Sequence, residues 1–362
     1  MFGKEQSFID VAFRENFIAS CGSNISGFEA DLEHYLKQDC FVAVLNSGTA
    51  AIHLALILLG VGENDEVICQ SNTFIASVNP VIYQGSTPIL VDSEADTWNM
   101  CPELLEIAIK DRISKGKKLK AIIAVHLYGM PYKVEAIHSI AKKYEIPIIE
   151  DSAEALGSSY KERKCGTFGD LSIVSFNGNK IITTSGGGAL ITKHKALKEK
   201  AIFLSTHAKD KSVDYLHSNI GYNYRMSNIS AGIGRGQMLA LDKYINTRRH
   251  NYALYKERLK EFDSIRFLNE PKHHFSNRWL TCVLTESFSK REKLRMFFEK
   301  ENIETRPLWK PMHQQPIFKD VPKYINGISD ELHKKGLCLP SGSNLTENDF
   351  DRIIHCFTEI YG

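Results

Sequence analysis

The sequence has no closely spaced cysteines, no long apolar run and almost no net charge. Its eight cysteines form no CxxC pair, and zinc sites of the finger or ribbon type need such pairs, so we expect no metal site. Disulfide frameworks are typical of short secreted chains, so we expect reduced, mostly buried thiols in a cytoplasmic protein. No apolar run approaches the ~20 residues of a transmembrane helix, which predicts no membrane insertion. The formal net charge of +2 gives no reason to expect nucleic-acid binding.

What the sequence does contain is a regular alternation of short β-rich and longer helical runs between residues 41 and about 206. The whole chain has 362 residues, and at ~100–200 residues per domain this length favours two domains. Runs such as Phe41–Leu45 and Leu119–Val125 are largely apolar, which indicates strands covered on both faces. The alternation predicts an α/β fold with a mainly parallel sheet. Pro80 should kink or restart the helix expected over Phe74–Tyr83.

The pattern changes after about residue 240. Leu241–Phe262 is a long charged helical stretch, and Trp279–Leu284 is β-rich. Arg306–Ser343 holds many Pro and Gly residues and is predicted to be loop. We therefore divide the chain into a large domain, residues 1–240, and a smaller α+β C-terminal domain, residues 241–362.

A glycine-containing turn joins the first β-rich run to the helix that follows, with the sequence Asn46-Ser47-Gly48-Thr49-Ala50-Ala51. Gly48 permits a tight turn, and Thr49 can cap the helix. Free N–H groups and the positive end of the helix dipole make such an N-terminus a natural phosphate site. A plain capped turn is the alternative interpretation of the same residues.

Three carboxylates follow a second apolar run, in Ile148-Ile149-Glu150-Asp151-Ser152-Ala153-Glu154. The ends of strands are where α/β sheets hold their ligands. Asp151 is a candidate to pair with a protonated pyridine nitrogen, and Glu154 lies one helical turn further along. Acidic residues at strand ends also serve as helix caps, and that alternative stays open.

A lysine stands between a predicted buried strand and a glycine run. It is Lys180, in Ser175-Phe176-Asn177-Gly178-Asn179-Lys180, and Thr183-Thr184-Ser185-Gly186-Gly187-Gly188 follows it. A lysine in a desolvated site can attack an aldehyde to form an imine, whereas a lysine in a loop is usually solvated. Ser175 can add a hydroxyl to a phosphate site. Phe74 can stack on a pyridine ring, although a packed core phenylalanine is the alternative.

In their order along the chain, these motifs resemble those of the DegT/DnrJ-type sugar aminotransferases, which are fold-type I enzymes that use pyridoxal 5'-phosphate. The resemblance extends over nearly the whole length, through NSGTAAIHLAL, HLYG (126–129), EDSAEALGS, GTFGD (166–170), SFNGNK, GYNYRMSN (221–228), RPLWKPMH (306–313) and LPSG (339–342). It implies a three-layer fold-type I architecture with a mainly parallel central sheet.

The resemblance also implies a role for each matching residue. Lys180 would hold the cofactor as a Schiff base and serve as the catalytic acid and base. The other expected cofactor contacts are Asp151 at the pyridine nitrogen, Phe74 on the ring, Gly48, Thr49 and Ser175 at the phosphate, and Glu154, where many relatives have Gln. Asn223 would reach the phosphate of a neighbouring subunit, which implies a homodimer with shared active sites.

Within this family, EDSAEALGS and SFNGNKIITTSGGG most resemble the 4-aminotransferases of UDP-N-acetylbacillosamine synthesis. That resemblance implies L-glutamate as amino donor and UDP-2-acetamido-2,6-dideoxy-α-D-xylo-hexos-4-ulose as acceptor. Arg306, Lys310 and His313 are the candidates to meet the nucleotide diphosphate, with an exposed polar loop as the alternative. A perosamine-type enzyme acting on a GDP-4-keto-6-deoxy sugar is a second hypothesis. A sugar dehydratase, in which histidine typically replaces the lysine, and a non-catalytic regulator are further ones.

Overall fold

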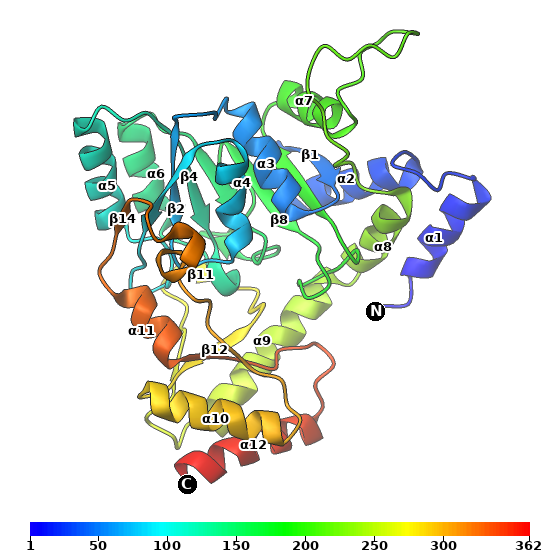
Figure 1. Cartoon of the computed structure of the whole chain (residues 1–362). Helices are drawn as coiled ribbons and strands as arrows, with labels where there is room; N and C mark the ends of the chain where they lie inside the picture. Colours follow the sequence, from blue (N-terminus) through cyan, green and yellow to red (C-terminus); the bar gives the residue numbers. More distant parts are fainter.

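The computed structural model describes residues 1–362 and contains a large α/β part and a smaller part below it (Figure 1). An eight-stranded sheet forms the centre of the large part. Its strands in spatial order are β1 (Phe41–Leu45), β9 (Gly188–Thr192), β8 (Leu171–Ser175), β5 (Ile148–Asp151), β4 (Leu119–Val125), β2 (Glu66–Gln70), β3 (Thr87–Val91) and β14 (Lys323–Tyr324). Only β9 runs antiparallel to both of its neighbours, β1 and β8, and all other pairs are parallel. The expectation of a mainly parallel sheet is confirmed.

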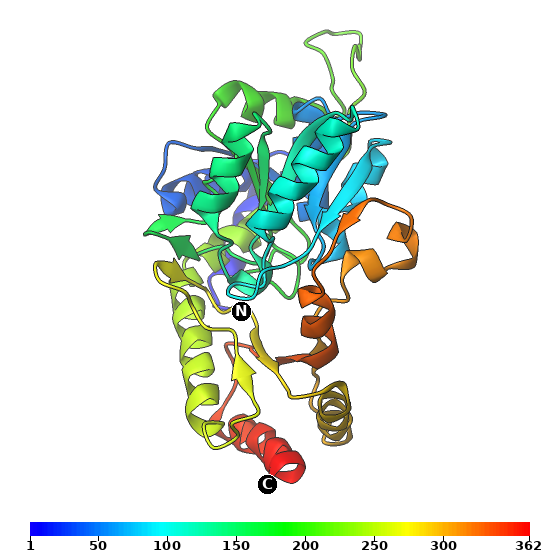
Figure 2. The same ribbon diagram turned by 90° about the vertical axis from the view of Figure 1, so that its left-hand side faces the viewer.

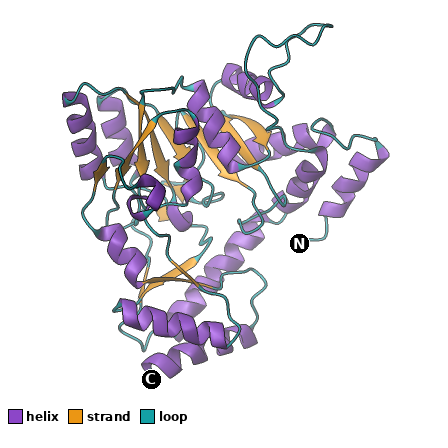
Figure 3. Ribbon diagram, viewed as in Figure 1, coloured by secondary structure: helices purple, strands orange, loops and turns teal.

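Helices cover both faces of this sheet, which makes three layers (Figures 2 and 3). Successive residues of β4 show why the strands are apolar throughout. Ala121 and Ile123 pack in the cluster that contains residues of α3 (Gly48–Leu58) and α7 (Lys195–Ser205), whereas Ile122 and Ala124 pack in the cluster that contains residues of α5 (Pro102–Ser114) and α6 (Val134–Lys143). The covering helices are α2 (Ser23–Leu36), α3 (Gly48–Leu58), α4 (Asn79–Tyr83), α5 (Pro102–Ser114), α6 (Val134–Lys143), α7 (Lys195–Ser205) and α8 (Asn228–Met238), while α1 (Glu5–Arg14) packs on α8.

Of two local predictions in the large part, the structure confirms one and contradicts the other. The segment predicted as one helix over Phe74–Tyr83 is a short 3₁₀ turn, η1 (Ile75–Ser77), followed by α4, with Pro80 in the first turn of α4. The restart at this proline is confirmed. The cap expected at Thr49 is wrong, because α3 begins at Gly48 and the side chain of Ser47 accepts the hydrogen bond from Ala50 N at 3.0 Å.

The smaller part is built on helix α9 (Leu241–Arg258) and a four-stranded antiparallel sheet. The sheet has the order β10 (Arg266–Phe267), β12 (Thr281–Leu284), β15 (Gly336–Leu339) and β13 (Arg306–Pro307). Helices α10 (Phe288–Lys300), α11 (Ile328–Lys335) and α12 (Glu347–Tyr361) pack with it. A further small sheet joins β11 (His274–Phe275) to β6 (Ser159–Tyr160) and β7 (Arg163–Lys164).

The prediction that Arg306–Ser343 is loop is wrong for much of its length. This segment contains β13, α11 and β15, together with the 3₁₀ turns η3 (Met312–Gln314) and η4 (Pro316–Phe318). It also contains β14, which pairs with β3 at the edge of the large sheet. Prolines and glycines here separate short elements that only tertiary pairing stabilises. We propose the division at residue 240 as the point where the chain leaves the large core, although β14 later returns to it.

Two further features concern the surface and the thiols. The segment between α7 and α8 projects from the body in both views (Figures 1 and 2), and it carries exposed apolar side chains such as Val213, which is 93% exposed, Tyr215 and Ile220. All eight cysteines are free and seven of them are buried. No helix is both long enough and apolar enough to span a membrane.

Candidate active site

A cavity of about 300 Å³ lies at the carboxyl ends of the central parallel strands. This is the edge at which open α/β sheets bind ligands. Seven of the residues predicted from the sequence line this cavity: Gly48, Thr49, Phe74, Asp151, Glu154, Ser175 and Lys180. Lys180 is the only cationic side chain among the lining residues.

One end of the cavity is formed by the N-terminus of α3. The N–H groups of Gly48 and Thr49 belong to the first turn of the helix, so no helical carbonyl can accept from them. Backbone crowding explains the glycines here. A Cβ at Gly188 would lie 2.5 Å from Gly48 N, and a Cβ at Gly48 would lie 3.1 Å from the Cβ of Ser175. The hydroxyl of Ser175 therefore lies beside unpaired N–H donors, which is the arrangement that binds a phosphate.

Asp151 stands at the end of β5, buried and held in one orientation. Its Oδ2 accepts from Ser77 Oγ at 2.6 Å, and its Oδ1 accepts from Ala153 N at 3.0 Å. The hydroxyl of Ser77 also lies 2.8 Å from Thr73 Oγ1, so the η1 turn supports the carboxylate. Asp151 has no salt-bridge partner within the chain, although a buried carboxylate favours a cation beside it. The sequence did not predict Ser77, which looks like an ordinary helix residue.

Lys180 and Glu154 lie close together in the lining of the cavity. The Nζ of Lys180 lies 3.6 Å from Glu154 Oε1, and Glu154 Oε2 accepts from Tyr128 N at 2.6 Å. Burial raises the pKa of Glu154, and the nearby Lys180 and the Tyr128 N–H only partly oppose this effect. Tyr128 is itself buried and has a φ of 54°, a left-handed conformation that presents its N–H to the carboxylate.

Aromatic side chains form the wall and the mouth of the cavity. Phe74 is 48% exposed, and its ring lies 5.3 Å from that of Trp309. The backbone N of Trp309 donates to the Tyr128 hydroxyl at 2.8 Å. The ring of Trp279 lies 4.2 Å from Lys180 Nζ. The sequence predicts neither tryptophan as a site residue, because Trp309 lies in the RPLWKPMH motif without an assigned role and Trp279 has the pattern of a strand residue.

The remaining predicted site residues lie outside this cavity. Asn223 is exposed, and its carbonyl accepts from Asn46 Nδ2 at 3.0 Å. Arg306 lines a neighbouring cavity of about 500 Å³ and pairs with Glu304 at 2.8 Å. Lys310 is exposed. The fourth such residue, His313, is engaged by its neighbours.

The side chain of His313 connects the two parts of the molecule. Its Nδ1 lies 2.7 Å from Ser71 Oγ, just after β2, and its Nε2 lies 2.8 Å from Asp330 Oδ1 on α11. Both ring nitrogens therefore have partners within the chain. This placement gives His313 a bridging position, and its expected contact with a nucleotide stays a prediction.

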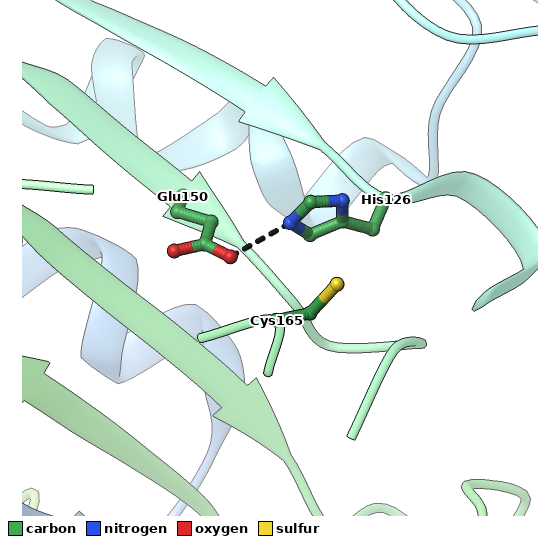
Figure 4. A group of neighbouring side chains, drawn as sticks. All are labelled: His126, Glu150 and Cys165. Carbon is green, nitrogen blue, oxygen red and sulfur yellow. Dashed lines mark hydrogen bonds and ion pairs between the residues drawn. The ribbon is translucent and has the colours of Figure 1, made fainter. Parts of the chain in front are cut away.

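His126 and Glu150, which are chain neighbours of the lining residues Val125 and Asp151, form with Cys165 a buried group of potential metal ligands, with ligand atoms within 4.8 Å of one another (Figure 4). The oxygens of Glu150 are already engaged. They accept from His126 Nε2 at 2.7 Å, the N–H groups of Gly166, Phe168 and Gly169 at 2.6 to 2.9 Å, and the hydroxyls of Ser152 and Ser172 at 3.1 and 2.8 Å. Tyr132 N donates to His126 Nδ1 at 3.2 Å. These bonds make the group a support for the strand ends that carry the site.

The residues of the cavity fit pyridoxal phosphate. The α3 N-terminus and Ser175 suit a phosphate, and a buried carboxylate with no cationic partner, Asp151, suits a protonated pyridine nitrogen. Lys180 Nζ provides a primary amine for an aldehyde. The three groups line one cavity, and the donor set is the one that this cofactor requires.

Comparison with known proteins gives a consistent result. Residues 3–358 match the DegT/DnrJ/EryC1/StrS aminotransferase family. EpsN of Bacillus subtilis strain 168, provisionally assigned as a pyridoxal phosphate-dependent aminotransferase, is 46% identical over 100% of this chain and 94% of its own length. GDP-perosamine synthase of Escherichia coli O157:H7 is 38% identical over 99% of this chain and 96% of its own.

A similar solved structure is that of a DegT DnrJ EryC1 StrS aminotransferase from Brucella abortus. It superposes with a TM-score of 0.92 and 28% sequence identity, and the match covers 99% of this chain and 95% of that one. The three-layer aminotransferase fold expected from the sequence is thereby confirmed.

Proposed function

Because this chain belongs to the DegT/DnrJ/EryC1/StrS aminotransferase family and is a pyridoxal-phosphate-dependent nucleotide-sugar aminotransferase, we propose that it transfers the amino group of L-glutamate to C4 of UDP-2-acetamido-2,6-dideoxy-α-D-xylo-hexos-4-ulose. The product is the UDP-4-amino sugar, a precursor for bacterial surface glycans. The observation that carries the proposed chemistry is the meeting of Lys180, Asp151 and the α3 N-terminus around one cavity.

Each residue has a defined task in this proposal. When bound, pyridoxal phosphate supplies an electron sink that stabilises negative charge at the carbon losing its proton. Lys180 binds the cofactor and, once free, its Nζ takes up the Cα proton of glutamate and later releases it to complete the transfer. Asp151 keeps the pyridine nitrogen protonated by charge pairing, and Phe74 packs on the ring. Gly48, Thr49 and Ser175 hold the phosphate.

A second copy of the chain completes the proposed site. The cavity has a single cationic lining residue, although its ligands carry phosphates and carboxylates. Asn223 is exposed at the base of the projecting segment, and the apolar side chains of that segment are suited to burial against another surface. We propose a homodimer in which Asn223 reaches the phosphate site of its partner.

The acceptor sugar is inferred from motifs and from the surroundings of the cavity. EDSAEALGS and SFNGNKIITTSGGG resemble the UDP-sugar 4-aminotransferases most. The neighbouring cavity shares Asn179, Trp279 and Trp309 with the first one, so a long substrate can extend from one into the other. Arg306 and Lys310 are the proposed contacts of the nucleotide diphosphate.

A GDP-4-keto-6-deoxy sugar is the second candidate acceptor. Relatives with a named sugar product include a GDP-perosamine synthase that is 38% identical to this chain. Both hypotheses place the same chemistry at C4 and differ in the nucleotide and in the C2 substituent, so one experiment can separate them.

The test follows the absorbance of the bound cofactor in two stages. L-Glutamate should convert the band of the lysine-bound cofactor to that of the aminated cofactor. The UDP-4-keto sugar should then restore the original band, and the GDP-4-keto sugar should not. Restoration by the GDP sugar alone would move the assignment to the perosamine type. Restoration by neither sugar would remove both acceptors.

Lys180→Ala is the decisive variant in this assay. We expect it to lose the lysine-bound band and the transfer activity, because no other lysine lines the cavity. Lys164→Ala is the matched control, since Lys164 is half-buried and lies over Tyr35, away from the cavity lining. Normal transfer by Lys180→Ala would contradict the assignment of the catalytic lysine.

A further inference from the structure

Trp279 is held against Lys180 by bonds from several directions. Its side chain is 1% exposed, and its indole N–H donates to Asn179 O at 2.8 Å, the carbonyl directly before Lys180. Its backbone N donates to Asn277 Oδ1 at 2.9 Å, and its carbonyl accepts from Arg248. The ring therefore has a fixed orientation relative to the backbone of the lysine.

The π face of this ring and one carboxylate surround the amine of Lys180. Nζ lies 4.2 Å from the centre of the Trp279 ring and 3.6 Å from Glu154 Oε1. Tryptophan is the aromatic side chain that attracts a cation most strongly, and the attraction grows where water is excluded. A positive charge on this amine therefore has two attractive partners, the ring face and the carboxylate.

We propose that Trp279 is a positioning residue for the aminotransfer reaction, and that its π face receives the Lys180 ammonium each time the amine takes up a proton. This inference rests on the proposed role of Lys180. When Nζ accepts the Cα proton of the amino donor, the C–H bond breaks, its electron pair stays with the carbon and Nζ becomes –NH₃⁺. The ring of Trp279 stabilises that charge without a hydrogen bond, so this contact occupies none of the N–H bonds that return the proton.

If Trp279 had only a structural role, its variants would behave differently. If Trp279 only filled space, Phe and Leu in its place would affect the reaction through packing. If its π face holds the ammonium, Trp279→Phe keeps part of the stabilisation of the Lys180 ammonium and Trp279→Leu loses it. The two substitutions therefore separate the two roles.

The first measurement uses cofactor-free protein and needs no catalysis. The chain has three tryptophans, so fluorescence can be followed with few emitters. We expect Lys180→Met to change the tryptophan emission, because the charge over Trp279 is removed, and we expect Trp279→Phe to abolish that difference. Lys164→Met is the control, because its amine lies over Tyr35. An unchanged emission in Lys180→Met would overturn the proposal without any substitution of Trp279 itself.

The second measurement is the rate of the glutamate half-reaction in rapid mixing, with ordinary and α-deuterated glutamate. We expect Trp279→Leu to slow proton removal roughly 3- to 30-fold and to raise the deuterium isotope effect, with Trp279→Phe in between. The affinity for pyridoxal phosphate should stay within about threefold, because Trp279 holds the amine and not the phosphate or the ring nitrogen.

The outcomes separate this proposal from the proposed function. Equal rates and isotope effects for the Phe and Leu variants would reduce Trp279 to a packing residue and overturn the inference. Failure of wild-type protein to react with any 4-keto sugar would remove the proposed acceptor, yet the glutamate half-reaction and the fluorescence difference would still decide the role of Trp279.

Discussion

At the scale of single residues, most side chains of the site are oriented by a neighbour that the motifs do not name. Ser77 holds Asp151, Tyr128 N holds Glu154, and Trp279 lies over Lys180. A residue's identity supplies the chemical group, whereas its neighbour decides the direction and the charge of that group. Glu154 illustrates this point, because the N–H of Tyr128 holds one of its oxygens and burial raises its pKa.

Glu154→Gln gives a pH-dependent prediction for stability. Burial raises the pKa of Glu154 in the folded protein above that in the unfolded chain. The stability that this residue contributes is therefore fully present below the unfolded pKa of about 4.5 and is lost as the pH rises through the folded pKa. We expect the free energy of unfolding of Glu154→Gln to increase relative to wild type as the pH rises.

Urea unfolding of the cofactor-free proteins between acidic and mildly alkaline pH measures this difference. Glu135→Gln is the control, because Glu135 is exposed and paired with Lys161 on the surface. If the free energy of unfolding of Glu154→Gln instead decreases relative to wild type as the pH rises, the attraction of Lys180 outweighs burial at this site.

At the scale of elements, Glu150 holds the loop after β7 against the central sheet through hydrogen bonds. Burial alone would raise its pKa, but the bond from His126 and the N–H groups of Gly166 and Gly169 outweigh that effect and lower the pKa to about 2. Glu150→Gln replaces an acceptor oxygen with an NH₂ group that faces donors. We expect it to lower the free energy of unfolding at neutral pH by about 3 kcal/mol.

The pH dependence of this effect has the opposite sign to that of Glu154. A lowered pKa gives stability that is present above about pH 4.5 and lost as the pH falls towards 2. The loss in Glu150→Gln should therefore shrink in acid, which denaturant unfolding at several pH values can follow. An equal loss at all pH values would point to packing as its cause.

The contact between β9 and the start of α3 gives a prediction about the phosphate site. A Cβ at Gly188 would lie 2.5 Å from Gly48 N, a backbone atom that cannot rotate away. We expect Gly188→Ala to displace the α3 N-terminus and to weaken pyridoxal phosphate binding roughly tenfold, at a cost of about 1–3 kcal/mol in stability. Gly178→Ala is the matched control, because no atom lies within 4 Å of its added Cβ. Equal cofactor titrations for the two variants would contradict this account.

At the scale of the whole molecule, the proposed homodimer can be tested by complementation. Lys180→Ala and Asn223→Ala subunits should each form poorly active homodimers. If Asn223 acts in the partner's site, a mixed dimer carries both defects in one site and an intact second site. Random mixing of equal amounts should then restore about a quarter of the wild-type sites. No recovery after unfolding and refolding the two variants together would place Asn223 in its own subunit's site.

Local sequence patterns are enough to predict the type of fold and the chemical groups of the candidate site. Apolar runs such as Leu119–Val125 predict strands covered on both faces, and the strand ends they imply carry Asp151 and the Gly48 turn. Such patterns are local, because each depends on periodicity or on residues adjacent in the chain. The restart at Pro80 was predictable for the same reason, since proline restricts its own backbone.

The contacts between distant segments depend on the folded chain and cannot be predicted from local patterns. β14 and β15 are too short to be recognised by pattern, and they exist because β3 and β12 provide partners for their backbone groups. Trp279 reaches Lys180 from almost 100 residues further along the chain, and His313 joins Ser71 to Asp330. The burial of a side chain, its contacts and the shift of its pKa depend on segments that are remote in sequence and pack together without water between them. No local pattern carries that information.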